Sequence, residues 1–147
     1  MNLPILRVKS LRENAVLPAY GSAYAAGADL CACIDAPWAI QPGETRLVPT
    51  GLAVEVPAGY AGLIYARSGL ASKRGLAPAN KVGVVDADYR GEVMVALHNH
   101  SNQAQEIAPG ERIAQLVVTP FLQVNYEWAD TLEDTDRGAG GFGSTGK

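Results

Sequence analysis

Turn residues cut this chain into short pieces, and this feature most limits the folds open to it. Nine prolines and 16 glycines are spread along its 147 residues. Proline-containing breaks at Gln41–Glu44, Val56–Gly59 and Ala108–Glu111 separate runs rich in β-forming residues. These runs are Ile5–Lys9, Gly27–Ile34, Thr45–Val56, Tyr60–Ala66, Lys81–Val85, Glu92–His98 and Arg112–Pro120. Because such runs are too short for long helices, we predict an all-β sandwich or barrel.

One segment, Ser68–Gly75, lacks this alternation and predicts a helix of about two turns. Ser68 is a preferred N-cap residue, and Gly75 is a preferred residue at a helix end. Arg67 and Ser68 then lie at the start of the helix, where backbone N–H groups favour an anion. On this segment alone, we favour the alternative of a plain capped surface helix.

Length and charge limit the classes of function. With 147 residues and 48% hydrophobic content, the chain predicts one compact domain. A net charge of −3 argues against a nucleic-acid partner, because phosphate binding needs a basic face. No apolar stretch is long enough for a signal peptide or a membrane span. We therefore predict a cytoplasmic protein with neither a nucleic-acid nor a membrane partner.

Residue types that often bind metals are sparse in this chain. Cys31 and Cys33 are the only cysteines, and we predict reduced thiols rather than a metal or redox pair. His98 and His100 share a face at strand spacing, but without a third ligand we predict ordinary polar side chains. The two tryptophans, Trp38 and Trp128, are predicted to be packing anchors.

The stretch Gly83–Val93, GVVDADYRGEV, has the pattern of two strands joined by a tight turn, so we predict a β-hairpin. One aspartate in a turn has a structural explanation, but two strands that deliver Asp86 and Tyr89 to one rim indicate a site. A carboxylate there can act as a general base, and a tyrosine ring offers a flat wall for a sugar. Asp29 and Gln115 are further polar candidates at or within other apolar strands.

The chain ends in the glycine-rich stretch RGAGGFGSTGK, residues 137–147. Glycine loses more backbone freedom on folding than other residues and brings no side chain, so something else must order this tail. The stretch satisfies the dinucleotide-binding pattern and most of the phosphate-loop pattern, but both motifs work only before a helix, so we predict neither kind of site here. The acidic segment 127–136 before it is predicted to be a solvated linker.

Five stretches together resemble, in order and spacing, the motif set of the trimeric all-β dUTPases. They are AGADL (26–30), RSGLA (67–71), NKVGVVDADYRGEV (80–93), GERIAQLV (110–117) and RGAGGFGSTG (137–146). Each stretch alone is a weak signal, but their joint occurrence is highly specific. The resemblance spans nearly the whole chain.

The resemblance implies a fold and an activity. It implies a homotrimer of jelly-roll-like subunits, with residues 1–136 as the domain and residues 137–147 as a flexible arm that closes over the active site at a subunit boundary. The implied reaction is hydrolysis of dUTP to dUMP and pyrophosphate by attack of water on the α-phosphorus. This reaction limits uracil in DNA and supplies dUMP for thymidylate synthesis. Ordering ten residues costs about 10 kcal/mol, so we expect arm closure to depend on the triphosphate.

Residue roles follow from the same resemblance. Asp86 is the implied general base, and Tyr89 the implied neighbour of the deoxyribose. The residues implied to read or shape the uracil pocket are Asn80, Gly83, Val85 and Met94. The residues implied to contact the phosphates are Arg67, Ser68, Gly69 and Gln115. The arm residues implied to cover the nucleotide are Arg137, Phe142, Gly143 and Ser144, with Phe142 lying over the uracil.

The sequence shows no set of protein ligands for a metal. The resemblance implies Mg²⁺ as cofactor, held by the substrate phosphates and by waters, since magnesium dehydrates reluctantly. Asp29 is implied to order a water that serves the metal or a neighbouring arginine.

Two other functions stay open. A dCTP deaminase, or a bifunctional deaminase and dUTPase, shares the fold but uses a glutamate base near a different second motif. A nucleotide-sensing trimer without turnover is the second alternative, and it is disfavoured because Asp86 and the arm are intact.

Overall fold

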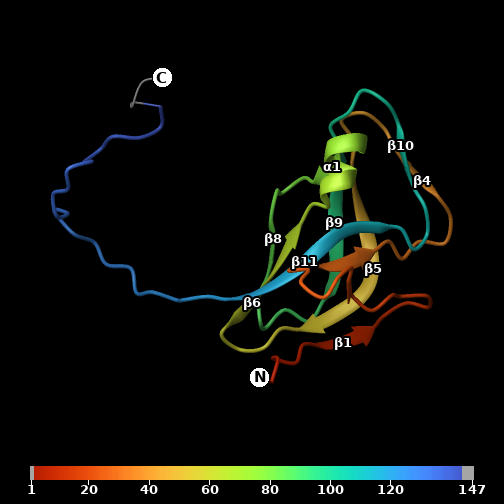
Figure 1. Ribbon diagram of the computed structural model, residues 1–147, viewed down its shortest axis with the longest axis horizontal. Helices are drawn as coiled ribbons and strands as arrows, with labels where there is room; N and C mark the ends of the chain where they lie inside the picture. Colours follow the sequence, from red (N-terminus) through yellow and green to blue (C-terminus); the bar gives the residue numbers. More distant parts are fainter. Residues whose placement is uncertain (1, 144–147) are drawn as a thin grey trace.

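The structure is a computed structural model that describes residues 2–143 and consists mostly of antiparallel β-strands (Figure 1). Its elements, in chain order, are β1 (Arg7–Ser10), β2 (Ala19–Tyr20), β3 (Ala28–Cys31), β4 (Trp38–Ile40), β5 (Thr45–Glu55), β6 (Tyr60–Tyr65), α1 (Ser68–Arg74), β7 (Leu76–Pro78), β8 (Gly83–Val85), β9 (Glu92–Asn99), β10 (Gln105–Ile107) and β11 (Arg112–Pro120). The all-β prediction with one short helix is therefore confirmed.

The strands form two main sheets and one small pair. One sheet has the order β1-β5-β9-β7, the other has the order β2-β3-β11-β6-β8, and β10 pairs with β4. Alternate residues of β9 are buried, as expected for a strand with one face on a core. The core contains Leu30, Ile64 and Leu116 from one sheet together with Val95 and Leu97 from the other.

Neither sheet closes on itself within residues 2–143, so the barrel alternative is wrong and the sandwich is right. Closure would require the outer strands of one sheet to pair with each other. Instead, β1 and β7 end one sheet, while β2 and β8 end the other. The structure therefore leaves free strand edges on this part of the chain.

The helix α1 occupies the predicted segment, but the prediction of Ser68 as the N-cap residue is wrong. Arg67 is the N-cap residue, with extended backbone and no side-chain capping bond, and Ser68 already lies inside the helix. The Ser68 carbonyl accepts a hydrogen bond from the Ser72 hydroxyl. Gly75 ends the helix in the left-handed conformation, with φ of 66°.

The predicted hairpin over Gly83–Val93 is also wrong. The strand β8 pairs with β6, whereas β9 pairs with β5 and β7 in the other sheet. Residues 86–91 therefore form an arch, by which we mean a connection that crosses from one sheet to the other. Alternating apolar residues show which face of a strand is buried, but they do not show which strand it pairs with. The arch leaves a space between β8 and β9 that a hairpin would fill.

After β11, the chain leaves the body of the sandwich and extends away from it (Figure 1). Residues 121–143 contain no helix or strand. Trp128 is fully exposed at 105%, so its predicted role as a packing anchor is not fulfilled within this chain. Trp38 does pack, since the Arg46 guanidinium lies 4.1 Å from the centre of its ring. Within residues 2–143, no helix has the length and apolar character that a membrane crossing needs.

Candidate active site

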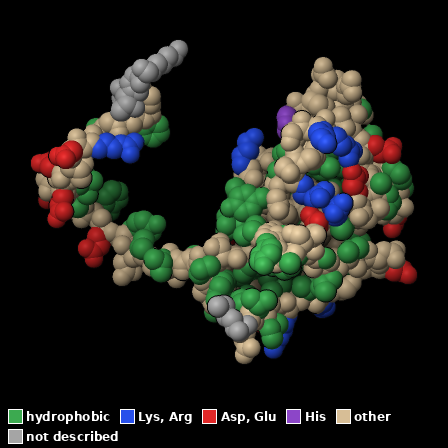
Figure 2. Space-filling view, in the orientation of Figure 1, with side chains coloured by type: hydrophobic (Ala, Val, Ile, Leu, Met, Phe, Trp, Pro, Cys, Tyr) green, Lys and Arg blue, Asp and Glu red, His purple; other side chains and the backbone are tan. Residues whose placement is uncertain are grey.

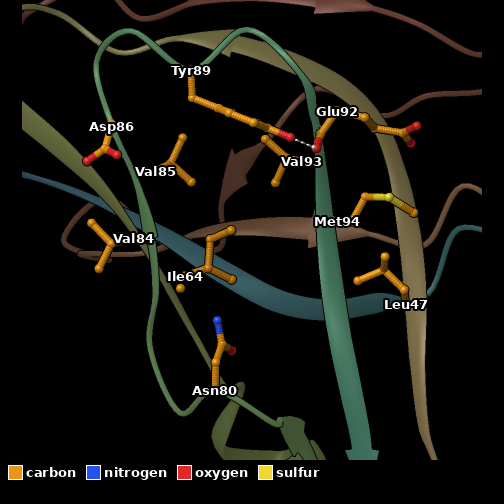
Figure 3. Close-up of a pocket in the computed structure, with 11 residues that line it drawn as sticks. Leu47, Ile64, Asn80, Val84, Val85, Asp86, Tyr89, Glu92, Val93 and Met94 are labelled. Carbon is orange, nitrogen blue, oxygen red and sulfur yellow. Dashed lines mark hydrogen bonds between the residues drawn. The ribbon is translucent and has the colours of Figure 1, made fainter.

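Six of the predicted site residues surround one cavity of about 380 Å³ under the arch, between β8 and β9 (Figure 3). These six are Asn80, Gly83, Val85, Asp86, Tyr89 and Met94. The sequence reasoning missed five further lining residues, which are Leu47, Ile64, Val84, Glu92 and Val93. All but Glu92 are apolar, so nothing in their chemistry distinguished them from ordinary core residues. The cavity combines apolar walls with a few polar groups, as small-molecule sites commonly do.

Asp86 and Tyr89 are positioned by the backbone of the arch itself. The Tyr89 N–H donates to the Asp86 carbonyl at 3.2 Å, which closes a turn. The Arg90 guanidinium donates to the carbonyl oxygens of Ala87 at 2.6 Å and Tyr89 at 3.0 Å. These bonds satisfy carbonyls that no sheet partner reaches. The Asp86 side chain is exposed at the end of β8, where water can reach its carboxylate.

Tyr89 forms the upper edge of the cavity. Its side chain extends across the space toward β9, and its hydroxyl donates to the Glu92 carbonyl at 2.9 Å (Figure 3). The Glu92 carboxylate is held in turn by three hydrogen bonds from Arg12, at 3.0 to 3.2 Å, and one from the Gly51 N–H at 2.9 Å. The hydrogen bonds from Arg12 lower the pKa of Glu92 below its usual value. Arg12 and Gly51 thus support the far wall of the site.

Asn80 lies at the opposite end of the cavity from Tyr89 (Figure 3). It stands in a tight turn, in which the Val82 N–H donates to its carbonyl at 2.8 Å and Lys81 has a φ of 66°. A Cβ on Gly83 would lie 3.4 Å from the Asn80 amide nitrogen and 3.3 Å from Ile64 Cβ. Glycine at position 83 therefore lets the amide lie close to the strand edge.

A second, smaller hollow of about 220 Å³ holds the other polar candidates. Its lining includes Asp29, Arg67, Ser68, Gly69 and Gln115. The amide of Gln115 donates to the Ala66 carbonyl at 2.9 Å, which meets the expectation that this amide needs a partner. A Cβ on Gly27 would lie only 2.3 Å from the Gln115 amide oxygen, so glycine is needed there for close approach.

Asp29 contacts arginine directly in this second hollow. One carboxylate oxygen accepts from Arg67 Nε at 2.8 Å, and the other lies 3.5 Å from a terminal nitrogen of Arg112. The Asp29 side chain is only 17% exposed, which limits competition from water. Asp29 therefore holds Arg67 in place, and Arg112 is a neighbour that the sequence reasoning missed.

The two hollows share no lining residue in one chain. The sheet order explains this separation, because β6 stands between β11 and β8. Of the predicted arm residues, Arg137, Phe142 and Gly143 line neither hollow. Arg137 Nε instead donates to the Gly140 carbonyl at 2.7 Å, and Phe142 is fully exposed. Ser144 lies outside the described residues.

The cysteines and histidines form no metal centre in the described residues, where no group of three or more His, Cys, Asp or Glu side chains could hold an ion. Cys31 and Cys33 are both free thiols, as predicted. Burial, followed by the charge of Asp29, raises the pKa of Cys31, which favours the protonated thiol. His98 Nδ1 lies 2.9 Å from the Thr45 hydroxyl on the paired strand.

Comparison with known sequences identifies close relatives. The dUTPase family model matches residues 13–146. The deoxyuridine 5'-triphosphate nucleotidohydrolase of Thiobacillus denitrificans is 50% identical over 148 residues, covering 100% of this chain and 99% of that protein. The enzyme of the same name from Hahella chejuensis is 50% identical, covering 94% of this chain and 91% of that protein.

Solved structures resemble the fold closely. A mutant dUTPase of Staphylococcus bacteriophage 80alpha, solved with dUpNHpp, has a TM-score of 0.88 and 28% identity, and covers 99% of this chain and 100% of its own. A mutant dUTPase from phage phi11 of S. aureus, described for its coordination of a structural Mg(II) ion, has a TM-score of 0.80 at 25% identity, covering 89% of this chain and 100% of its own. Sequence motifs, fold and relatives agree, and the chain belongs to the dUTPase family.

Proposed function

We propose that this protein is a dUTP diphosphatase, which hydrolyses dUTP to dUMP and pyrophosphate by attack of water on the α-phosphorus. The observation that carries this proposal is the cavity under the arch, which Asp86, Tyr89 and Asn80 line together. The full-length relatives named deoxyuridine 5'-triphosphate nucleotidohydrolase support the choice of substrate. The reaction removes dUTP, which limits uracil in DNA, and it supplies dUMP for thymidylate synthesis.

In this proposal, the cavity under the arch holds the deoxyuridine. The amide of Asn80 and backbone groups of Gly83 and Val85 read the uracil, because a strand edge presents donors and acceptors in a fixed order. The Tyr89 ring packs against the deoxyribose. Asp86 accepts a proton from the attacking water, as a solvent-accessible carboxylate can.

The second hollow supplies contacts for the phosphates. Arg67 offers its remaining guanidinium N–H groups, since Asp29 uses Nε. Ser68, Gly69 and Gln115 add hydroxyl, backbone and amide groups beside it. Charge-assisted hydrogen bonds of this kind contribute about 1.5–3 kcal/mol each. Asp29 therefore acts on the phosphates by orienting Arg67.

The site requires more than one chain in this proposal. The two hollows share no lining residue in a single chain, and no residue of 137–143, the described part of the arm, lines either hollow. We propose a homotrimer in which neighbouring chains bring the two hollows together and the arm, residues 137–147, closes over the nucleotide. Phe142 then covers the uracil, while Arg137, Gly143 and Ser144 surround the phosphates.

Exposed apolar side chains before the arm support this assembly. Leu122, Val124, Tyr126 and Trp128 alternate with polar residues and are 59–105% exposed. They project from the extended chain without cover from the body of the sandwich (Figure 2). An alternating apolar face of this kind is typical of a strand that packs against another surface.

We propose Mg²⁺ as the cofactor. The donor set fits an ion carried mainly by the substrate phosphates and waters, because the described residues contain no cluster of protein ligands. When bound, the ion would neutralise charge on the phosphates. Asp86 takes the proton from the attacking water, and Arg67 orients the phosphates. In this proposal neither role requires a contact with the ion.

Release of pyrophosphate from dUTP in the presence of Mg²⁺ tests the proposal directly. We expect turnover with dUTP and none above background with dCTP. Release of ammonia from dCTP would instead indicate a deaminase or a bifunctional enzyme. Tight dUTP binding without pyrophosphate release would indicate a nucleotide sensor.

A further inference from the structure

Gly91 stands where the arch joins β9, and its own backbone does not explain why it is a glycine. Its φ lies outside the left-handed region, in contrast to Gly75 at 66° and Gly110 at 76°. A left-handed backbone is therefore not what this position requires. A neighbouring group must explain the absence of a side chain.

The Tyr89 ring is that neighbouring group. A Cβ on Gly91 would lie 2.4 Å from the Tyr89 hydroxyl oxygen, 2.7 Å from its Cζ and 3.0 Å from its Cε2. Side-chain carbons do not tolerate such distances, so the ring can lie there only because position 91 has no Cβ. In this position the hydroxyl donates to the Glu92 carbonyl at 2.9 Å (Figure 3).

We infer that Gly91 is a positioning residue that fixes the Tyr89 ring, and that ribonucleotides are excluded through this ring. The inference rests on the proposed function, in which this ring packs against the deoxyribose. The ring is held at one end by the chain and at the other by its hydroxyl bond to Glu92. A ring fixed in this way stays in one position, and a sugar with a 2′-hydroxyl needs the space that the ring occupies.

The consequence of adding a Cβ follows from the exposure of Tyr89. The side chain is 45% exposed, so it can turn away from Gly91 without displacing the core. The hydroxyl bond to Glu92 would then break, and the ring would no longer mark the edge of the cavity. Gly91→Ala should therefore change selectivity much more than it changes folding.

The test is a double-mutant cycle with Gly91→Ala, Tyr89→Ala and the combined variant. The measured quantity is the ratio of kcat/KM for dUTP to kcat/KM for UTP. Gly91→Ala should lower this ratio about 10- to 100-fold, the range for one small steric contact. Tyr89→Ala should lower it as well. The combined variant should be no worse than Tyr89→Ala alone, because without the ring the added Cβ meets nothing.

Three results would overturn the inference while leaving dUTP hydrolysis in place. The first is a wild-type ratio in Gly91→Ala beside a lowered ratio in Tyr89→Ala. The second is an additive loss in the combined variant, which would mean that the two positions act independently. A wild-type ratio in Tyr89→Ala would remove the proposed sugar contact, and the inference with it. Thermal unfolding and particle size are measured for all variants, and if Gly91→Ala alone misfolds, recovery of folding in the combined variant supports the clash.

Discussion

Asp86 is the residue on which the proposed chemistry depends, and the arch offers a matched control two positions away. Asp86 lines the cavity, whereas Asp88 lies on the other side of the arch, against β5 and the start of the chain. Asp86→Asn keeps the shape of the side chain and loses the base. We expect its turnover to fall about 10²- to 10⁴-fold while a non-hydrolysable dUTP analogue still binds. Calorimetry measures the binding of the analogue, and initial rates measure the turnover.

Asp88→Asn should retain turnover within a factor of about three, because its carboxylate does not face the cavity. Equal losses in the two variants would show that the arch needs negative charge in general. A near-normal rate in Asp86→Asn would remove Asp86 from the role of base.

Glu92 gives a prediction about stability and pH. Its carboxylate accepts from Arg12 and from the Gly51 N–H, and the Arg12 hydrogen bonds lower its pKa below the usual 4.5. A carboxyl group whose pKa is lowered by folding stabilises the protein above its unfolded-state pKa and loses this effect as the pH falls through the folded-state pKa. Glu92→Gln should therefore lower the Tm by about 3 °C at pH 7, with the difference shrinking below about pH 4.

Glu55→Gln is the control for this pH dependence. Glu55 is 48% exposed and lies 3.8 Å from both Arg7 and Arg90, so its ion pairs are weak and open to solvent. We expect a Tm near that of the wild type at every pH. A difference between Glu92→Gln and wild type that persists unchanged at low pH would contradict the role given to the ionised carboxylate.

At the level of elements, strand length determines how much of the fold the sequence could predict. The strands β5, β9 and β11 have 11, 8 and 9 residues, and their patterns predict them almost to the residue. The strands β2, β4, β7 and β10 have two or three residues, too few to alternate, and the sequence does not predict them. The three-residue β8 is predicted only because it lies within the longer run Lys81–Val85. The sequence predicts a hairpin in place of the arch because strand pairing depends on contacts between distant segments, which a local pattern does not show.

The end of α1 shows how a turn and a close contact combine at one glycine. Gly75 has a φ of 66°, and a Cβ there would lie 2.8 Å from Ser101 Cβ and 3.0 Å from its backbone nitrogen. Gly110 has a φ of 76° but open space around it. Gly110→Ala should cost about 1–2 kcal/mol for the left-handed conformation alone. Gly75→Ala should cost about 3 kcal/mol or more, because packed backbone must also move.

Chemical denaturation measures the free energies of unfolding of Gly75→Ala and Gly110→Ala. The decisive result is whether Gly75→Ala is the less stable of the two. Gly75 follows the helix that carries Ser68 and Gly69, so we also expect weaker substrate binding in Gly75→Ala. Equal destabilisation in the two variants would mean that the contact with Ser101 relaxes without cost.

At the level of the whole molecule, the motifs predict which residues belong to the site, but one chain does not unite them. The stretches at 26–30 and 67–71 line one hollow, the stretch at 80–93 lines the other, and Arg137 and Phe142 lie on the arm beyond both. Each sequence motif shows which chemical groups it contributes. The distance between the motifs depends on the order of strands in the sheets and, in our proposal, on neighbouring chains. This separation explains why the sequence predicts candidate residues but not how they are arranged.

Two truncations separate the assembly from the closure of the site. A chain that ends after Arg137 retains the exposed apolar residues Leu122, Val124, Tyr126 and Trp128 but lacks Phe142 and the glycines. We expect it to keep the particle size of the full chain, with turnover lowered at least about 100-fold, because two or more charge-assisted hydrogen bonds of about 1.5–3 kcal/mol are lost.

A chain that ends after Pro120 also lacks the alternating apolar residues, which each contribute about 1.5–3 kcal/mol when they are buried. We expect this shorter chain to lose both turnover and assembly, and analytical ultracentrifugation measures the difference. If it kept the particle size of the full chain, these side chains would not hold the assembly together. If the chain that ends after Arg137 kept full turnover, the arm would not close the site, and the cavity under the arch would bind and hydrolyse dUTP without it.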